Sequence, residues 1–210
     1  DENSANGTVV GTVVATDGDV NDTGFISWII IDGNPDNAFA INSTTGQITV
    51  ANYSALDIES IASFTLTLTV SDGTNTSDSE VVIIALNDVN EHSPSISEEQ
   101  NLSVDENAEV GTVVGTIAAS DTDHTAQLEW TLLSQDYAGA FAVDSTTGQV
   151  TILDNTYLDY ETISSIELQV EISDGQYSTS NSVIININNI NDVNPVIANR
   201  YYFSSSDVMD

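Results

Sequence analysis

The sequence predicts an all-β fold made of two tandem Greek-key β-sandwich domains. Apolar and polar residues alternate in many short segments, and no segment of helical length shows an apolar period of 3.6 residues. The two halves of the chain also repeat each other. The length of 210 residues fits two domains of about 100 residues each, and about seven strands per domain fit a Greek-key sandwich.

Strands are expected wherever the alternation is clear. Residues 64–70 alternate apolar residues with threonine, which is typical of a strand with one buried face. Gly46 and Gly148 each follow a threonine and supply the turns of two hairpins, because glycine accepts a positive φ at little cost. Trp28 and Trp130 occupy matching strand positions and are expected in the core. Further strands are expected at 8–16, 26–31, 81–86, 113–118, 129–133, 166–172 and 182–187.

The internal duplication sets the expected domain boundaries. Asp1-Glu2-Asn3 recurs at 105–107, Ser43-Thr44-Thr45-Gly46-Gln47 at 145–149, Leu56-Asp57-Ile58-Glu59 at 158–161, Ser71-Asp72-Gly73 at 173–175, and Asn87-Asp88-Val89-Asn90 at 191–194. The first repeat is expected at 1–94, without its first strand and with an exit linker at 88–94. The second is expected at 95–197, with its first strand at 96–104. Residues 198–210 form a tail, interpreted as the start of a third repeat.

Charge narrows the choice of partners. The chain has 33 Asp and Glu residues against one Lys or Arg, a formal charge of −32, while 40% of its residues are hydrophobic. Phosphate binding needs clusters of Lys and Arg, so nucleic acid and anionic membrane surfaces are disfavoured. There is no cysteine, and no apolar run reaches the roughly 20 residues of a membrane helix. Multivalent cations are the natural partners.

The linker 88–94 carries side-chain oxygens at alternate positions and ends at Pro94. Alternate side chains of an extended segment point to opposite sides. A short run rich in oxygen does not fill a core, but it suits a hard cation such as Ca2+, which binds 6 to 8 oxygens. The linker is therefore predicted to be a joint between two domains, held by calcium.

The ordered motifs resemble tandem cadherin repeats. They are Glu-Asn near each start, Asp-x-Asp, Leu-Asp-x-Glu, Ser-Asp-Gly and the linker pattern Asp-x-Asn-Glu-His-x-Pro. The resemblance implies about three Ca2+ ions in the joint. Three ions would leave about −2 of the charge of the eight carboxylates. The implied ligands are Glu2, Asp57 and Glu59, then Asp88, Asn90, Glu91 and the carbonyls of Val89 and His92, and finally Asp121, Asp123 and Asp174.

The same resemblance implies half a site at the end of the second repeat. Its residues would be Glu106, Asp159, Glu161, Asp192 and Asn194, and Asn191-Asp192-Val193-Asn194-Pro195 is interpreted as an exit without the Glu-His-x stretch. His92 and His124 stand next to expected ligands and are interpreted as solvent-facing loop residues. Neither histidine belongs to a recognisable nucleophile motif, so no enzyme is predicted.

Two functions remain open at this stage. The first is an extracellular, calcium-dependent adhesion module at the cell surface, a stiff rod that makes homophilic contacts with another copy of itself. The alternative is a carbohydrate-binding or spacer module of a secreted microbial protein, because the composition is similar to bacterial cadherin-like arrays. An exposed aromatic strip on a sheet face would favour a polysaccharide ligand, whereas a self-complementary patch would favour adhesion. Sequons for N-glycosylation occur at Asn6, Asn21, Asn42, Asn52, Asn75 and Asn101, and would matter only in a eukaryotic secretory setting.

Overall fold

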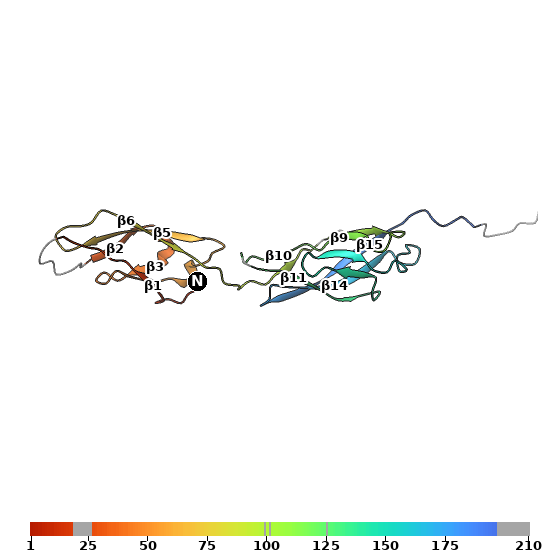
Figure 1. Cartoon of the computed structure of the whole chain (residues 1–210), viewed down its shortest axis with the longest axis horizontal. Coiled ribbons are helices and arrows are strands. Elements are labelled where there is room, and N and C mark those ends of the chain that lie inside the picture. The colour runs from red at the N-terminus through yellow and green to blue at the C-terminus, as the bar shows by residue number, and fades with distance from the viewer. Residues whose placement is uncertain (19–26, 99, 101, 125, 197–210) are drawn as a thin grey trace, which may run out of the picture. The chain divides into compact units, whose positions relative to one another are not determined.

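The computed structural model describes residues 1–18, 27–98, 100, 102–124 and 126–196 (Figure 1). The chain forms two compact units. The first comprises Asp1–Ile96, Ala119–Glu129 and Ile172–Thr179, and the second comprises Ser97–Ala118, Trp130–Glu171 and Ser180–Asp210. The expected tail 198–210 lies outside the described residues, and the domain boundary near Pro94 stays a prediction. No helix in the described part is long and apolar enough to cross a membrane.

In the part of the first half that the structure describes, six strands form two antiparallel three-stranded sheets. One sheet has the order β1-β4-β3 and the other the order β2-β5-β6. Two short 3-10 turns, Pro35–Asn37 and Tyr53–Ala55, are the only helical elements among the described residues. The strands are β1 (Val9–Thr12), β2 (Ser27–Asp32), β3 (Phe39–Ile41), β4 (Gln47–Val50), β5 (Ser63–Ser71) and β6 (Glu80–Ala85).

The described residues of the second half form nine strands. One sheet has the order β11-β14-β15-β8, a second has the order β12-β13-β9, and β10 pairs with β7. Strand β8 runs parallel to β15, with Ile185 opposite Leu102. Among the described residues, no strand lies beside β6 as β8 lies beside β15. The strands are β7 (Ser95–Ile96), β8 (Leu102–Asp105), β9 (Val113–Thr116), β10 (Ala119–Ser120), β11 (Glu129–Gln135), β12 (Phe141–Val143), β13 (Gln149–Ile152), β14 (Ser165–Ser173) and β15 (Ser178–Asn188).

The prediction of all-β sandwiches is confirmed, but one expected strand is wrong in its extent. Residues 96–104 were expected to form one strand, whereas the structure has two, β7 and β8. The two strands pair with different partners, β7 with β10 and β8 with β15. A change of partner requires the pairing to stop between them, which explains the break.

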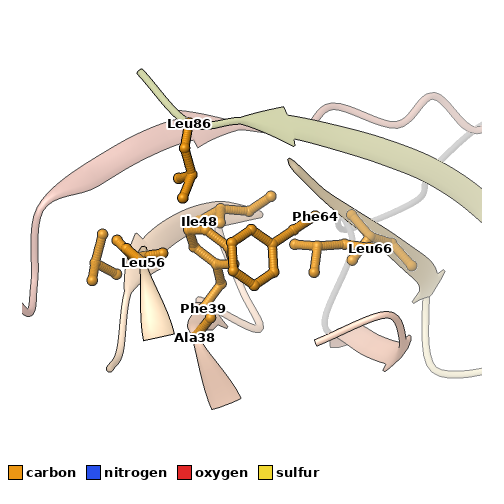
Figure 2. Close-up of a cluster of buried hydrophobic side chains, with 9 residues drawn as sticks. Ala38, Phe39, Ile48, Leu56, Phe64, Leu66 and Leu86 are labelled. Carbon is orange, nitrogen blue, oxygen red and sulfur yellow. The ribbon is translucent and has the colours of Figure 1, made fainter. Parts of the chain in front are cut away.

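Alternation builds the core of the first repeat. In β5, Phe64, Leu66, Leu68 and Val70 are buried, while the residues between them are exposed or half-buried. The rings of Phe39 and Phe64 pack edge to face, with centroids 5.0 Å apart, at the centre of a cluster completed by Ala38, Ile48, Val50, Leu56, Leu66, Leu68 and Leu86 (Figure 2). Burying each large side chain contributes about 1.5–3 kcal/mol. Strand β14 shows the same burial pattern as β5.

The two predicted hairpin turns carry tryptophans against their glycines. Gly46 has a φ of 67° and Gly148 a φ of 68°, values that L side chains rarely adopt. A Cβ on Gly148 would lie 2.7 Å from Nε1 of Trp130, and one on Gly46 would lie 3.1 Å from Cε2 of Trp28. Trp28 is buried, as expected, and Trp130 is half-buried. Glycine is therefore required at both turns for conformation and for space.

Candidate metal centre

Glu2 fixes the frame of the candidate site. Its side chain is buried, with 2% of the residue exposed. Oε2 accepts the N–H of Ile58 at 2.7 Å, and Oε1 accepts the N–H of Val89 at 2.8 Å. The N–H of Glu2 also donates to the carbonyl of Asn87 at 3.1 Å. One carboxylate thus ties the start of the chain to the Leu-Asp-x-Glu turn and to the linker.

The turn that follows the 3-10 element Tyr53–Ala55 presents two more carboxylates. Oδ2 of Asp57 accepts the hydroxyl of Ser60 at 2.9 Å, and this hydrogen bond lowers the pKa of Asp57. Oxygens of Glu2, Asp57 and Glu59 lie within 4.8 Å of one another. The sequence motif therefore brings its carboxylates together as expected.

The linker adds its own carboxylates around Glu59. Glu59 groups with Asp88 and His124, and separately with Glu91 and His92, each set offering ligand atoms within 4.8 Å. Oε1 of Glu91 accepts the side-chain amide of Asn3 at 2.7 Å. Burial raises the pKa of Glu91, and the nearby Glu2 and Glu59 charges raise it further. A raised carboxyl pKa indicates that this place disfavours negative charge in the absence of a cation.

Three aspartates from the second half complete the site, and they lie in the same compact unit. Carboxylate oxygens of Asp121, Asp123 and Asp174 lie within 4.8 Å of one another. Oδ1 of Asp174 accepts the N–H groups of Gln176 at 2.6 Å and Tyr177 at 2.7 Å. Burial opposes ionisation of Asp174, but these backbone hydrogen bonds hold its pKa below the ordinary value.

The two histidines are exposed to solvent, and each also contacts a carboxylate of the site. Their side chains are 44% and 59% exposed, for His92 and His124 respectively, in agreement with the expectation. However, Nδ1 of His92 lies 2.9 Å from Oδ1 of Asp123, and the N–H of His92 donates to Oδ2 of Asp123 at 3.1 Å. Nδ1 of His124 lies 3.2 Å from Oε1 of Glu59. The hydrogen bond to Asp123 raises the pKa of His92. These pairs were not predicted, because only the fold brings the partners together.

Several oxygens of the site are buried without a hydrogen-bond partner among the described residues. An unpartnered buried polar atom costs about 1–3 kcal/mol, and more when it is charged. The set contains carboxylate and amide oxygens, with no sulfur ligand, and it suits Ca2+ better than zinc or copper. The atoms are Oε2 of Glu59, Oδ1 of Asn90, Oε2 of Glu91, Oδ2 of Asp121 and Oδ2 of Asp174.

Val89 and His92 are expected to bind through backbone carbonyls, whereas the structure shows hydrogen bonds of their N–H groups. The N–H of Val89 is held by Glu2, and that of His92 by Asp123. The expectation for Val89 and His92 concerns their carbonyls, which stays a prediction. The carbonyl of Asn90 accepts the side-chain amide of Gln176 at 2.9 Å.

A second carboxylate group occurs in the second unit. Oxygens of Glu106, Glu161 and Asp192 lie within 4.8 Å of one another. Glu106 repeats the geometry of Glu2, because Oε2 accepts the N–H of Tyr160 at 2.7 Å and Oε1 accepts that of Ile190 at 2.6 Å. Of the half-site residues expected here, Asp159 is not a member of this group, and the expectation for Asn194 stays a prediction.

This geometry corrects the expected match between the two linkers. Ile190 occupies the place of Val89 under the buried glutamate, and the N–H of Glu106 donates to Asn188 as that of Glu2 donates to Asn87. The residue numbers in both pairs differ by 101. Asn87-Asp88-Val89-Asn90 therefore corresponds to Asn188-Asn189-Ile190-Asn191, and not to 191–194. The exit of the second repeat lacks no residues: Asp192 stands where Glu91 stands, and Pro195 where Pro94 stands.

Comparison with known proteins agrees with this architecture. The family model described as "Cadherin domain" matches residues 1–87 and again residues 100–188. The chain is 35% identical over 212 residues to human cadherin-related family member 2, covering 96% of this chain and 16% of that protein. It is 34% identical over 216 residues to mouse protocadherin Fat 4, covering 98% of this chain and 4% of that protein. The chain thus spans a small part of these relatives.

Solved structures show the same fold. The crystal structure of the human desmocollin-1 ectodomain matches with a TM-score of 0.71 and 26% identity, covering 86% of this chain and 36% of that one. Mouse cadherin-23 EC22-24 matches with a TM-score of 0.68 and 24% identity, covering 91% and 62%. These relatives are animal proteins rather than bacterial ones, which removes the support for a bacterial-type array.

Proposed function

This chain belongs to the cadherin family, as two tandem cadherin domains, and on that premise we propose that calcium ions bind at its linker and make it a stiff adhesion module. Cadherin domains are non-enzymatic adhesion modules of ectodomains, so the chain works by binding. The proposed ligands are the side chains of Glu2, Asp57, Glu59, Asp88, Asn90, Glu91, Asp121, Asp123 and Asp174, with the carbonyls of Val89 and His92.

The unpartnered buried oxygens of the expected ligands carry the proposal. Among the described residues there are five, and four of them are carboxylate oxygens of Glu59, Glu91, Asp121 and Asp174, which lie in close groups of potential metal ligands. The protein has few means of neutralising them, because it contains a single Lys or Arg residue and two histidines. Calcium supplies positive charge and accepts the flexible, mixed oxygen coordination that carboxylate, amide and carbonyl ligands provide. About three ions would balance most of the charge of eight carboxylates.

Binding would stiffen the linker because its ligands come from three segments of the chain. Glu2, Asp57 and Glu59 belong to the first repeat, whereas Asp121 and Asp123 follow β10 in the second. An ion that requires ligands from each segment holds them in one arrangement. Without the ion, close carboxylates repel by a few kcal/mol per pair at an effective dielectric constant of about 20. Calcium would therefore favour one fixed linker conformation.

The test is a calcium titration of this chain by calorimetry, followed by thermal melting and small-angle scattering. We expect binding of about three ions, a melting temperature that rises with free calcium above the dissociation constant, and a narrower distribution of shapes. Magnesium at the same concentration serves as the control, since it demands stricter octahedral geometry and gives up its water reluctantly. An absence of binding at millimolar calcium would overturn the proposal.

We also propose that this adhesion is homophilic, that is, between copies of the same chain. Beads coated with the chain should aggregate in calcium and disperse when calcium is chelated. Aggregation only with beads that carry a different cadherin would point to a heterophilic partner. A polysaccharide ligand is less well supported: the large aromatics exposed in the described residues are Tyr53, Tyr160 and Tyr177, and none of the three lies in a strand.

A further inference from the structure

The hairpin between β3 and β4 carries a sequon on its surface. The triplet is Asn42-Ser43-Thr44, and Asn42 is exposed. Oδ1 of Asn42 accepts the N–H groups of Thr44 at 3.0 Å and Thr45 at 2.9 Å, which closes the turn. Nδ2 of Asn42 donates no hydrogen bond to any other described residue, because both bonds of this side chain are accepted by Oδ1. The carbonyl half of this amide therefore supports the turn, and the nitrogen half remains available.

The second repeat contains the same hairpin with an aspartate in place of the asparagine. Oδ1 of Asp144 accepts the N–H groups of Thr146 at 3.1 Å and Thr147 at 2.8 Å. The following residues, Ser-Thr-Thr-Gly-Gln, are identical in both hairpins. A carboxylate has no N–H to donate, so the comparison establishes that the turn needs only an acceptor at this position. The amide nitrogen of Asn42 is not required for folding.

Asn52 provides the contrast among the described sequons. It is half-buried, its Nδ2 donates to the carbonyl of Asp36 at 3.1 Å, and its Oδ1 accepts the hydroxyl of Ser54, the third residue of its own sequon, at 2.8 Å. A sugar on that nitrogen would compete with a contact that the fold uses. The sequons at Asn21 and Asn101 lie outside the described residues.

We propose that Asn42 carries an N-linked glycan. Cadherin domains of this family belong to ectodomains, so the sequon passes through the secretory route. The co-reactant is a lipid-linked oligosaccharyl diphosphate. A bond forms between Nδ2 and the anomeric carbon of the sugar, the bond from that carbon to the phosphate oxygen breaks, the lipid diphosphate leaves, and Nδ2 loses one proton. N-linked sugars are bulky and sit on surface loops of secreted proteins, which matches this turn.

The experiment expresses this chain behind a secretion signal in animal cells. The purified protein is treated with peptide N-glycosidase in heavy-oxygen water, and its peptides are sequenced by mass spectrometry, so that each occupied asparagine is read as a labelled aspartate. We expect label at residue 42 in most molecules. Unlabelled Asn42 in the secreted protein would overturn the proposal.

The second hairpin supplies matched variants. Asn42→Asp copies the turn of the second repeat and should remove the glycan, and its melting temperature should equal that of the wild-type chain produced without glycans in bacteria. Thr44→Ala removes the sequon hydroxyl while keeping Asn42, and should also abolish the label. Asp144→Asn creates the sequon Asn-Ser-Thr in the second hairpin and should gain a glycan there. A secreted Asp144→Asn protein with no label at residue 144 would contradict the argument that this turn leaves its amide nitrogen available.

Discussion

Neutralising Glu59 is the sharpest test of the calcium site, because its effect should change sign with calcium. Among the described residues, Glu59 belongs to three groups of potential metal ligands in the first unit, and its Oε2 is buried without a hydrogen-bond partner. Glu59→Gln keeps the shape of the side chain and removes one negative charge. Any defect that depends only on shape would act in the same direction with and without calcium.

Without calcium the variant should be the more stable protein. Two carboxylates about 5 Å apart repel by about 3 kcal/mol at an effective dielectric constant of 20, and by about 1 kcal/mol in bulk water. The contact between Glu59 and His124 is lost as well, but the His124 side chain is 59% exposed, and such surface pairs contribute about 0–1 kcal/mol. Relief of repulsion therefore outweighs the lost contact. We expect a gain of about 1–2 kcal/mol, which raises the melting temperature by about 4–8 °C per kcal/mol.

With calcium the order should reverse. A unit charge about 4 Å from Ca2+ contributes about 2 kcal/mol even at the dielectric constant of water, which corresponds to about 30-fold in the dissociation constant. At free calcium of about 100 times the wild-type dissociation constant, each ion stabilises the wild type by about 2.7 kcal/mol and the variant by about 0.8 kcal/mol.

The assay is differential scanning calorimetry of both proteins in chelator and in millimolar calcium. Glu109→Gln is the matched control, because Glu109 is exposed and lies outside the carboxylate groups. It should shift neither melting temperature appreciably. A Glu59→Gln protein that melts lower than the wild type in both buffers, or equally in both, would refute the reasoning.

Three further predictions concern protonation, packing and turns. In chelator, the hydrogen bond to Asp123 raises the pKa of His92, so its stabilising contribution is complete below the unfolded pKa of about 6.5 and disappears as pH rises through the folded value. The difference in melting temperature between the wild type and His92→Ala should shrink from pH 6 to pH 8, and an unchanged difference would contradict this. Phe64→Ala should cost about 3–5 kcal/mol in urea unfolding, and a loss under about 1 kcal/mol would refute its place in the core. Gly148→Ala should cost about 1–3 kcal/mol more than Gly111→Ala, because both have positive φ but only the first lacks room for a Cβ; equal losses would exclude the steric part.

Local alternation was enough to predict the long strands. Both β5 and β14 bury every second residue, and that pattern is visible in the sequence. The division of residues 96–104 was not predictable, because it depends on a long-range contact. The N–H of Ala118 donates to Oε1 of Gln100 at 2.7 Å, and Nε2 of Gln100 donates to the carbonyl of Ser97 at 3.0 Å. A side chain replaces strand pairing at this point, and periodicity does not reveal it.

In the candidate site, too, sequence motifs predicted the local features, whereas the contacts between distant residues were not predictable. The resemblance to cadherin motifs supplied the expected carboxylates, and the structure brings those of Glu2, Asp57 and Glu59 close together because a turn such as Leu-Asp-x-Glu presents its side chains locally. The contact between His92 and Asp123 joins residues 31 positions apart, and that between His124 and Glu59 joins residues 65 positions apart. Their only signal in the sequence was that each histidine stands beside an expected ligand. Position next to a ligand predicts proximity, but not which carboxylate is the partner.

The match between the two linkers failed for a physical reason that also bears on the second site. Identical residue types in the two linkers favoured 191–194 as the match. In the structure, however, the position of each linker follows from a buried glutamate that accepts two backbone N–H groups, as Glu106 does from Tyr160 and Ile190. Any residue except proline supplies a backbone N–H, so the residue types do not reveal which one bonds the glutamate, and the fold selects that of Ile190. In the resulting register an amide, Asn189, occupies the position that Asp88 holds in the first linker. The exit of the second repeat therefore presents one carboxylate fewer than the exit of the first. Because calcium affinity rises with the number of negatively charged ligands, the second exit should bind calcium more weakly than the first.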